Sequence, residues 1–136
     1  MINSKFIQDL DEECQNLCFQ LIREFELQGI RFILTSTYRD FEYQNYLYCQ
    51  GRSKPGQIVT NSKAGESYHN FHLAFDVVPI VDGKAKWDDQ NLWDKIGKIG
   101  ADVGLTWGGN FKTIKDKPHF QLDKISLEEI RLKNGH

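Results

Sequence analysis

Two short segments of the 136-residue chain hold the residues that most constrain its fold. The first reads SYHNFHLAFD at 67–76, and the second reads DKPH at 116–119. Together they offer His69, Asp76 and His119, and two imidazoles with one carboxylate are a set that zinc accepts while a fourth position stays open to water. Taken one at a time, such residues are more often ordinary buried histidines or aspartates of turns and salt bridges. As a set they require a fold that brings both segments to one place.

Asp116 adds a spare carboxylate three residues before His119. Zinc makes water acidic enough to supply a nucleophile near neutral pH, and a nearby carboxylate can take the proton as a general base. Aspartate is also common in turns such as the one expected at Lys117-Pro118, which is the structural alternative. The residues are those that a metal hydrolase needs.

The spacing fits no common zinc motif, because the chain has neither His-Glu-x-x-His nor a pair of Cys-x-x-Cys segments. The pattern Ser-x-His-x-x-x-x-Ala-x-Asp followed by Asp-x-x-His-Phe resembles instead the zinc peptidases of bacterial cell walls. This family contains VanY-like D-alanyl-D-alanine peptidases and L-alanyl-D-glutamate endopeptidases, including many phage endolysins. Further matching segments extend the resemblance over roughly 31–122, and they are Thr35–Arg39 with Gln44, Gly51–Arg52, Gly56–Asn61 and Leu105–Gly109.

The resemblance assigns a metal centre to the residues already named. It implies that His69, Asp76 and His119 bind one zinc ion and that Asp116 is the catalytic general base. Each histidine is expected to donate its second ring nitrogen to a carbonyl or carboxylate, as zinc-bound histidines generally do.

The resemblance also implies a set of substrate-binding residues. Arg39 suits either the oxyanion of the tetrahedral intermediate or a substrate carboxylate, because its guanidinium cannot lose its charge. Ser67 is expected to bond the substrate peptide, with fixation of its loop as the alternative. Gln44 and Trp107 complete the set, although a tryptophan is more often simply part of a core.

One position departs from the family pattern. His72 stands where the family usually has glycine, at the third position after His69. Glycine suits a backbone with positive φ or a close approach. The motif register keeps His69 as the ligand, so we expect the His72 side chain to point away from the metal. The alternative is that its imidazole acts as an additional or substitute ligand.

Composition limits the architecture to one small catalytic domain over 1–136. With 40% hydrophobic residues, including nine Phe and three Trp, the chain can fill a single core. No linker, repeat or low-complexity tract predicts a separate wall-binding domain. The formal net charge is -2 and the basic residues are dispersed, so nucleic acid is not an expected partner. Three cysteines, with Cys14 and Cys18 one helical turn apart, indicate reduced thiols.

The N-terminal sequence MINSKFIQDLDEE at 1–13 is acidic where a signal peptide needs an apolar run. No stretch approaches the ~20 apolar residues of a membrane span. We therefore expect no signal peptide and no membrane insertion. The resemblance then implies a monomeric phage endolysin that stays in the host cytoplasm until a holin opens the membrane, and then acts on the cell wall.

Hydrophobic periodicity and capping residues predict helices separated by short strands. The expected helices run from Asn3 or Ser4 to Gly29, over 41–50, over 88–103 and onward from Ser126. The expected strands cover 30–37, 73–80, 105–107 and 118–122, with a turn at 81–84 and a long loop at 52–66. This mixed order predicts an α+β fold with a small antiparallel sheet. The resemblance implies the DD-peptidase/Hedgehog-like zinc peptidase fold.

The resemblance implies hydrolysis of the L-alanyl-D-glutamate bond in the stem peptide of bacterial peptidoglycan. Two alternatives remain within the fold. A D-alanyl-D-alanine carboxypeptidase more often has Glu at the position of Asp116, and a non-catalytic zinc-binding module has no need of Asp116 or Arg39. The Trp107-Gly-Gly109 segment also resembles the endopeptidases.

Other hydrolase chemistries find less support in the sequence. A cysteine peptidase using Cys18 or Cys49, and a serine hydrolase using Ser67 with His69, both lack the signatures of their families.

Overall fold

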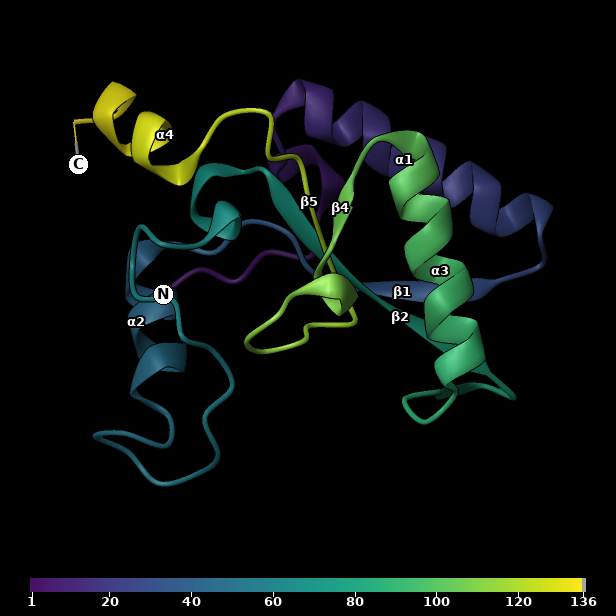
Figure 1. Ribbon diagram of the computed structural model, residues 1–136, viewed down its shortest axis with the longest axis horizontal. Coiled ribbons are helices and arrows are strands. Elements are labelled where there is room, and N and C mark those ends of the chain that lie inside the picture. Colours follow the sequence, from purple (N-terminus) through teal and green to yellow (C-terminus); the bar gives the residue numbers. More distant parts are fainter. Residues whose placement is uncertain (136) are drawn as a thin grey trace.

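The computed structural model describes residues 1–135 and shows an antiparallel sheet with helices around it (Figure 1). The strands are β1 (Arg31–Ser36), β2 (Ala74–Val81), β3 (Lys84–Ala85), β4 (Thr106–Trp107) and β5 (His119–Gln121). Their order is β1-β2-β5-β4, with β3 paired to β2 beyond this path. Every pairing is antiparallel, so the expected α+β fold with a small antiparallel sheet is confirmed.

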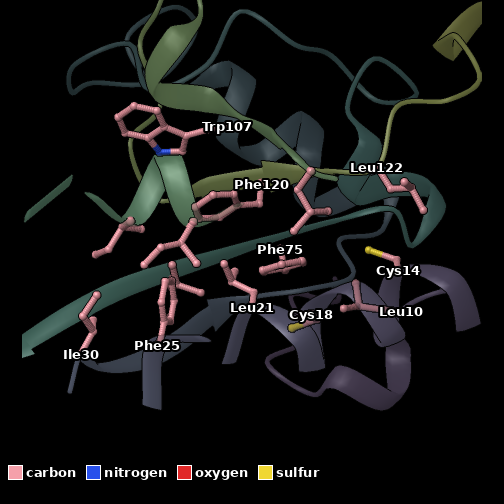
Figure 2. Close-up of a cluster of buried hydrophobic side chains, with 14 of the residues drawn as sticks. Leu10, Cys14, Cys18, Leu21, Phe25, Ile30, Phe75, Trp107, Phe120 and Leu122 are labelled. Carbon is pink, nitrogen blue, oxygen red and sulfur yellow. The ribbon is translucent and has the colours of Figure 1, made fainter. Parts of the chain in front are cut away.

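The hydrophobic core lies between the sheet and the helices α1 (Glu12–Leu27) and α3 (Gln90–Val103). Figure 2 shows Phe75 of β2 and Phe120 of β5 in the middle of this cluster, with α1 side chains such as Leu21 against them. The two phenylalanine rings are stacked with centroids 5.9 Å apart. The remaining helical elements are α2 (Phe41–Cys49), α4 (Leu127–Lys133), η1 (Ile7–Asp9), η2 (Tyr68–Phe71) and η3 (Gly108–Asn110).

Helix α3 approaches the sheet closely because it presents glycine at two buried positions. A Cβ atom at Gly97 would lie 2.2 Å from the Trp107 ring, and one at Gly100 would lie 2.1 Å from the Phe120 ring. Real side chains do not tolerate such contacts, so only glycine permits this packing. The close contact holds β4 and β5, and therefore the segment that carries His119, firmly against the core.

The start of α1 differs from the sequence prediction, which placed it at Asn3 or Ser4. The helix begins at Glu12, because the chain is extended at Leu10 after a single 3-10 turn. Asn3 and Ser4 bond to the end of β1 instead: Ser36 Oγ donates to Asn3 Oδ1 at 2.6 Å, and the amide of Ser4 donates to the Tyr38 carbonyl at 2.8 Å. Pairing with a distant strand thus overrides the local helical pattern.

Apart from the start of α1, the predicted helix caps and the predicted hairpin turn are found where the sequence placed them. Asp40 accepts a hydrogen bond from Tyr43 N at the start of α2, and Asp89 and Ser126 cap α3 and α4 in the same way. Asp82 and Gly83 have φ of 54° and 77° between β2 and β3, as a two-residue hairpin turn requires. Local sequence therefore determines most element boundaries after α1.

The 52–66 stretch forms a long loop beside α2, at the lower left of Figure 1. It leads directly into η2 and then β2. Within the described residues, no helix is long and apolar enough to cross a membrane.

Candidate metal centre

Strand pairing brings the two sequence segments together. Asp76 of β2 lies directly opposite His119 of β5 in the antiparallel register, and Ser36 of β1 lies beside Asp76 on its other side. His69 comes from η2, the short 3-10 turn that precedes β2, and Ser67 caps this turn by accepting from His69 N. The chain thus folds so that His69, Asp76 and His119 share one end of the sheet.

The three side chains form a compact buried cluster. His69 Nε2 lies 3.1 Å from Asp76 Oδ1 and 3.1 Å from His119 Nδ1, while His119 Nδ1 lies 3.3 Å from Asp76 Oδ1. His69 is 1% exposed, Asp76 is 8% exposed and His119 is 5% exposed. Ligand atoms at about 2.0–2.1 Å from a tetrahedral zinc ion lie about 3.3 Å apart. The observed triangle therefore fits a zinc ion with one coordination position left over.

Each ligand is oriented by a further contact on its outer side. His69 Nδ1 lies 2.7 Å from the Thr37 carbonyl, which fixes Nδ1 as the protonated nitrogen and leaves Nε2 as the ligand atom. His119 Nε2 lies 2.7 Å from the amide oxygen of Gln121, so its Nδ1 faces the cluster. Arg39 donates to Asp76 Oδ2 at 2.9 Å, which leaves Oδ1 toward the histidines. Both histidines have the expected carbonyl-type partner.

The local charges favour an ionised carboxylate in the cluster. Burial alone raises the pKa of Asp76, but the His69 and His119 imidazoles and the Arg39 guanidinium outweigh it and hold this pKa well below its usual range. Burial lowers the pKa of His69, because it disfavours the charged imidazolium. The pKa of His119 is raised, since its bond to Asp76 and the charges of Asp76 and Asp116 outweigh burial. Metal binding displaces any proton from the nitrogen that becomes a ligand.

Asp116 lies beside the cluster and outside it. Its Oδ2 is 3.9 Å from His119 Nδ1, and its side chain is half exposed. Removal of water from part of the carboxyl, together with the negative charge of Asp76, raises its pKa. A carboxylate in this position can reach a small molecule at the cluster without being a ligand itself.

The cluster lies at the base of a cleft of about 480 Å³. One side of the cleft is formed by 59–67, the end of the long loop, and we call it the 59–67 wall. The other side is formed by 111–116, between η3 and β5, and we call it the 111–116 wall. The side chains that line the cleft along these walls include Val59, Thr60, Asn61, Ser62, Glu66, Phe111, Thr113, Ile114 and Asp116.

Two of the four predicted substrate-binding residues line this cleft, and they are Arg39 and Ser67. Gln44 is buried beneath the 59–67 wall, where its Nε2 donates to the Ser62 carbonyl at 2.8 Å. Trp107 is buried against α3, and its indole N–H donates to the Lys117 carbonyl at 2.7 Å. Gln44 therefore supports the 59–67 wall from behind, and Trp107 holds the residue that follows the 111–116 wall. Direct contact with substrate stays a prediction for all four residues.

His72 adopts the left-handed conformation that the family pattern predicts for its usual glycine, with φ 64° and ψ 26°. Its Nδ1 lies 2.6 Å from the Asp9 carbonyl, and its ring stacks on Tyr38 with centroids 4.0 Å apart. It lines a separate cavity of about 600 Å³ near α4, and does not line the metal cleft. The imidazole is thus directed away from the cluster, as expected.

Sequence reasoning missed three residues that shape the site. Gln121 bonds His119, Asn70 bonds both the Gly65 amide and the Arg39 carbonyl, and Gly108 packs under Asp116. Gln121 could have been found, because it follows His119 by two residues on a strand and therefore lies on the same face. The roles of Asn70 and Gly108 depend on loop geometry that no spacing rule describes.

The fold and the sequence around the three candidate ligands are similar to those of known cell-wall peptidases. Residues 60–122, which contain all the ligands and Asp116, match a family model described as D-alanyl-D-alanine carboxypeptidase. The peptidoglycan L-alanyl-D-glutamate endopeptidase CwlK of Bacillus subtilis strain 168 is 40% identical over 104 residues, covering 70% of this chain. The chain spans 62% of the length of that relative.

Solved structures agree with this assignment at the level of the fold. The Serratia marcescens L-Ala D-Glu endopeptidase ChiX superposes with a TM-score of 0.65 at 22% identity, covering 85% of this chain and 82% of its own. The D,D-pentapeptidase VanY of a VanB-type resistance cassette, determined with Zn(II), gives a TM-score of 0.62 at 13% identity, covering 92% and 79%. This chain is thus similar in sequence to CwlK and in fold to VanY, which agrees with the resemblance that the sequence motifs indicated.

Proposed function

We propose that this protein is a zinc-dependent endopeptidase that hydrolyses the L-alanyl-D-glutamate bond of the peptidoglycan stem peptide. The observation that carries the proposal is the buried triangle of His69, Asp76 and His119 with Asp116 Oδ2 3.9 Å from His119 Nδ1. The similarity to CwlK and ChiX, both L-alanyl-D-glutamate endopeptidases, supports the choice of bond.

His69 Nε2, Asp76 Oδ1 and His119 Nδ1 would hold the ion. Zinc bound there supplies Lewis acidity, which polarises a carbonyl and makes water acidic enough to attack near neutral pH. Asp116 accepts the proton of the attacking water at its carboxylate and then transfers it to the leaving amine. Its raised pKa brings it nearer to neutrality, where a general base is most effective.

Arg39 contributes positive charge at the wall of the cleft. Its guanidinium is fixed by Asp76 Oδ2 at 2.9 Å and by Ser36 Oγ at 3.0 Å. A preorganised cation stabilises the oxyanion of a tetrahedral intermediate without reorganisation during the reaction. Ser67 lies in the 59–67 wall and offers a hydroxyl to the substrate peptide.

The metal is tested independently of the substrate. Purified protein should contain about one equivalent of zinc, because three protein ligands leave a single open site. A strong chelator should abolish lysis of cell walls, and added zinc should restore it. The His69→Ala variant is the control that should lose both zinc and activity. Full activity in protein shown to be metal-free would rule out the metallopeptidase.

The bond is tested by mass spectrometry of digested walls. Cleavage at L-alanyl-D-glutamate releases new amino groups on D-glutamate or its amide and no free D-alanine. Release of D-alanine as the main product would support the alternative function, that of a D-alanyl-D-alanine carboxypeptidase. The matching family model carries that description. Absence of any product from zinc-loaded protein would support a non-catalytic zinc-binding module.

The biological setting is a further part of the proposal. The family resemblance, which includes many phage endolysins, supports a monomeric enzyme of bacteriolysis that reaches the wall after a holin has opened the membrane. Cells expressing the protein should lyse when a holin is co-expressed and stay intact without it. Lysis without a holin would contradict this mode of release.

A further inference from the structure

A chain of side-chain hydrogen bonds leads from the buried His119 to the protein surface. His119 Nε2 lies 2.7 Å from Gln121 Oε1. Gln121 Nε2 donates to Asp123 Oδ2 at 3.0 Å, and Thr106 Oγ1 donates to Asp123 Oδ1 at 2.9 Å. Thr106 and Gln121 are cross-strand partners on β4 and β5, so the sheet itself holds the chain in register.

The charge of Asp123 determines which way the Gln121 amide points. An ionised carboxylate only accepts hydrogen bonds, so it must face the NH₂ group of Gln121. The amide oxygen is then turned toward His119. Reversal of the amide would place its oxygen against the Asp123 carboxylate, and two acceptors cannot bond to each other. An exposed aspartate thus fixes the orientation of a half-buried amide.

The orientation of the amide in turn fixes the tautomer of His119. An amide oxygen cannot donate, so a hydrogen bond to it requires the proton on His119 Nε2. A neutral imidazole protonated at Nε2 has its lone pair on Nδ1, and Nδ1 is the atom that faces His69 and Asp76. For His69 the same task is done by the Thr37 carbonyl, which belongs to the main chain and cannot be reversed.

We infer that Gln121 and Asp123 are positioning residues, which hold His119 in the tautomer and orientation that ligation through Nδ1 requires. The inference rests on the metal site of the proposed function and is independent of the substrate. Partners on the outer side of a metal-bound histidine typically contribute 10–100-fold to metal affinity. His119 is the ligand whose ring nitrogen depends on an orientable side chain.

The first test measures zinc affinity by competition with a chelator. Gln121→Ala should weaken zinc binding by roughly 10–100-fold, and Asp123→Asn by a smaller factor, because asparagine no longer dictates the orientation of the amide. Asp102→Asn is the matched control, since Asp102 is also an exposed aspartate that accepts a side-chain hydrogen bond, in its case from Lys98 on α3. Unchanged zinc affinity in both Gln121→Ala and Asp123→Asn would overturn the inference.

A reciprocal exchange separates positioning from a general effect of mutation. Gln121→Glu alone places two carboxylates side by side and should weaken zinc binding. When Gln121→Glu is combined with Asp123→Asn, the carboxylate now at position 121 still accepts a hydrogen bond from His119. The amide now at position 123 donates a hydrogen bond to that carboxylate. Zinc affinity in the double variant should therefore return to within a few-fold of wild type. Losses that simply add in the double variant would contradict a positioning role.

Ring-nitrogen chemical shifts give a readout that needs no metal. In zinc-free protein at about pH 9, where imidazoles are neutral, Gln121→Ala should raise the share of the Nδ1-H tautomer of His119, because Gln121 then no longer opposes the Asp76 carboxylate, which lies 3.3 Å from Nδ1. A pure Nε2-H tautomer in Gln121→Ala would overturn the inference. If wild-type protein bound no zinc, the proposed function would fail, whereas these shifts would still show whether Gln121 sets the tautomer.

Discussion

The two walls of the metal cleft are held in different ways. The 59–67 wall is tied down by side chains from outside it: Gln44 donates to Ser62 O, Asn45 accepts from Ala64 N, and Asn70 accepts from Gly65 N. Arg52 adds a bond to the Thr60 carbonyl at 3.0 Å. The wall is therefore fixed along its length, even though it has no regular secondary structure.

The 111–116 wall is held only at its two ends. The amides of Phe111 and Asp116 both donate to the Gly108 carbonyl, at 3.1 Å and 2.9 Å. Among the described residues, those from 112 to 115 have no hydrogen-bond partner. The wall that carries the proposed base is thus the less constrained one, whereas the wall of polar binding groups is rigid. Segments with few hydrogen bonds open at low free-energy cost.

The largest expected effect comes from removing the base from the 111–116 wall. Asp116→Ala should lower kcat by about 10²–10⁴-fold, because proton transfer loses its acceptor. Zinc should be retained, since Asp116 lies outside the ligand triangle. Steady-state rates on purified walls and metal analysis of the same sample check both points. Full activity in Asp116→Ala would place the base elsewhere.

The next largest effect is expected at Gly108, whose carbonyl accepts hydrogen bonds from both ends of the 111–116 wall. A Cβ atom at Gly108 would lie 2.3 Å from the Asp116 carbonyl oxygen and 2.9 Å from His119 Cβ. Gly108→Ala should cost about 1–3 kcal/mol of stability, as overpacking does. It should also weaken zinc binding by displacing His119. Thermal unfolding measures the loss of stability, and competition with a chelator measures the zinc affinity.

A matched control for Gly108→Ala is Gly83→Asn, in the hairpin turn between β2 and β3. A Cβ atom at Gly83 meets nothing within 4 Å, and asparagine tolerates the positive φ of this turn. The control should keep full stability and full zinc affinity. Equal behaviour of the two variants would show that the Gly108 contact does not position the 111–116 wall.

The residues around the cleft also show which parts of the site the sequence could predict. Spacing and family resemblance indicated Ser67, His69, Asp76, Asp116 and His119, and the structure brings the three candidate ligands of this set together on or next to β2 and β5. The strand register then places Asp76 opposite His119. Local patterns were sufficient wherever a strand, cap or turn defined the geometry.

What the sequence could not predict depends on distant contacts. The N-terminal segment pairs with the end of β1 through Asn3 and Ser4, which removes the first turns expected for α1. Gln44 and Trp107 were expected to bind substrate, which stays a prediction, and their observed bonds to the Ser62 and Lys117 carbonyls could not be read from the sequence. In each case the residue type was recognised, but its direction is set by tertiary packing that no local pattern encodes.

A smaller effect is expected from loosening the 59–67 wall. Gln44 is 1% exposed, and Gln44→Ala removes its bond to the Ser62 carbonyl and should cost about 1 kcal/mol of stability. The larger consequence should be a raised KM with kcat nearly unchanged, because the wall holds binding groups and the base lies opposite. Asn45→Ala, at an exposed amide, should be milder. A fall in kcat alone would contradict this division between the walls.

The smallest perturbation is limited proteolysis, which tests the comparison without changing a residue. Lys112 and Lys115 lie in the 111–116 wall, while Arg52, Lys54 and Lys63 lie in or just before the 59–67 wall, and all five are exposed. Exposure therefore cannot determine which site trypsin cuts first. The first cut should fall in the segment that unfolds locally at the lowest free-energy cost. Trypsin should cut first after Lys112, since Lys115 precedes an acidic residue and Lys117 precedes proline. The Lys112→Gln/Lys115→Gln variant should lose this early cut. Lys54 also precedes a proline, so a first cut after Arg52 or Lys63 would show that the side-chain bonds of the 59–67 wall do not make it the more rigid of the two.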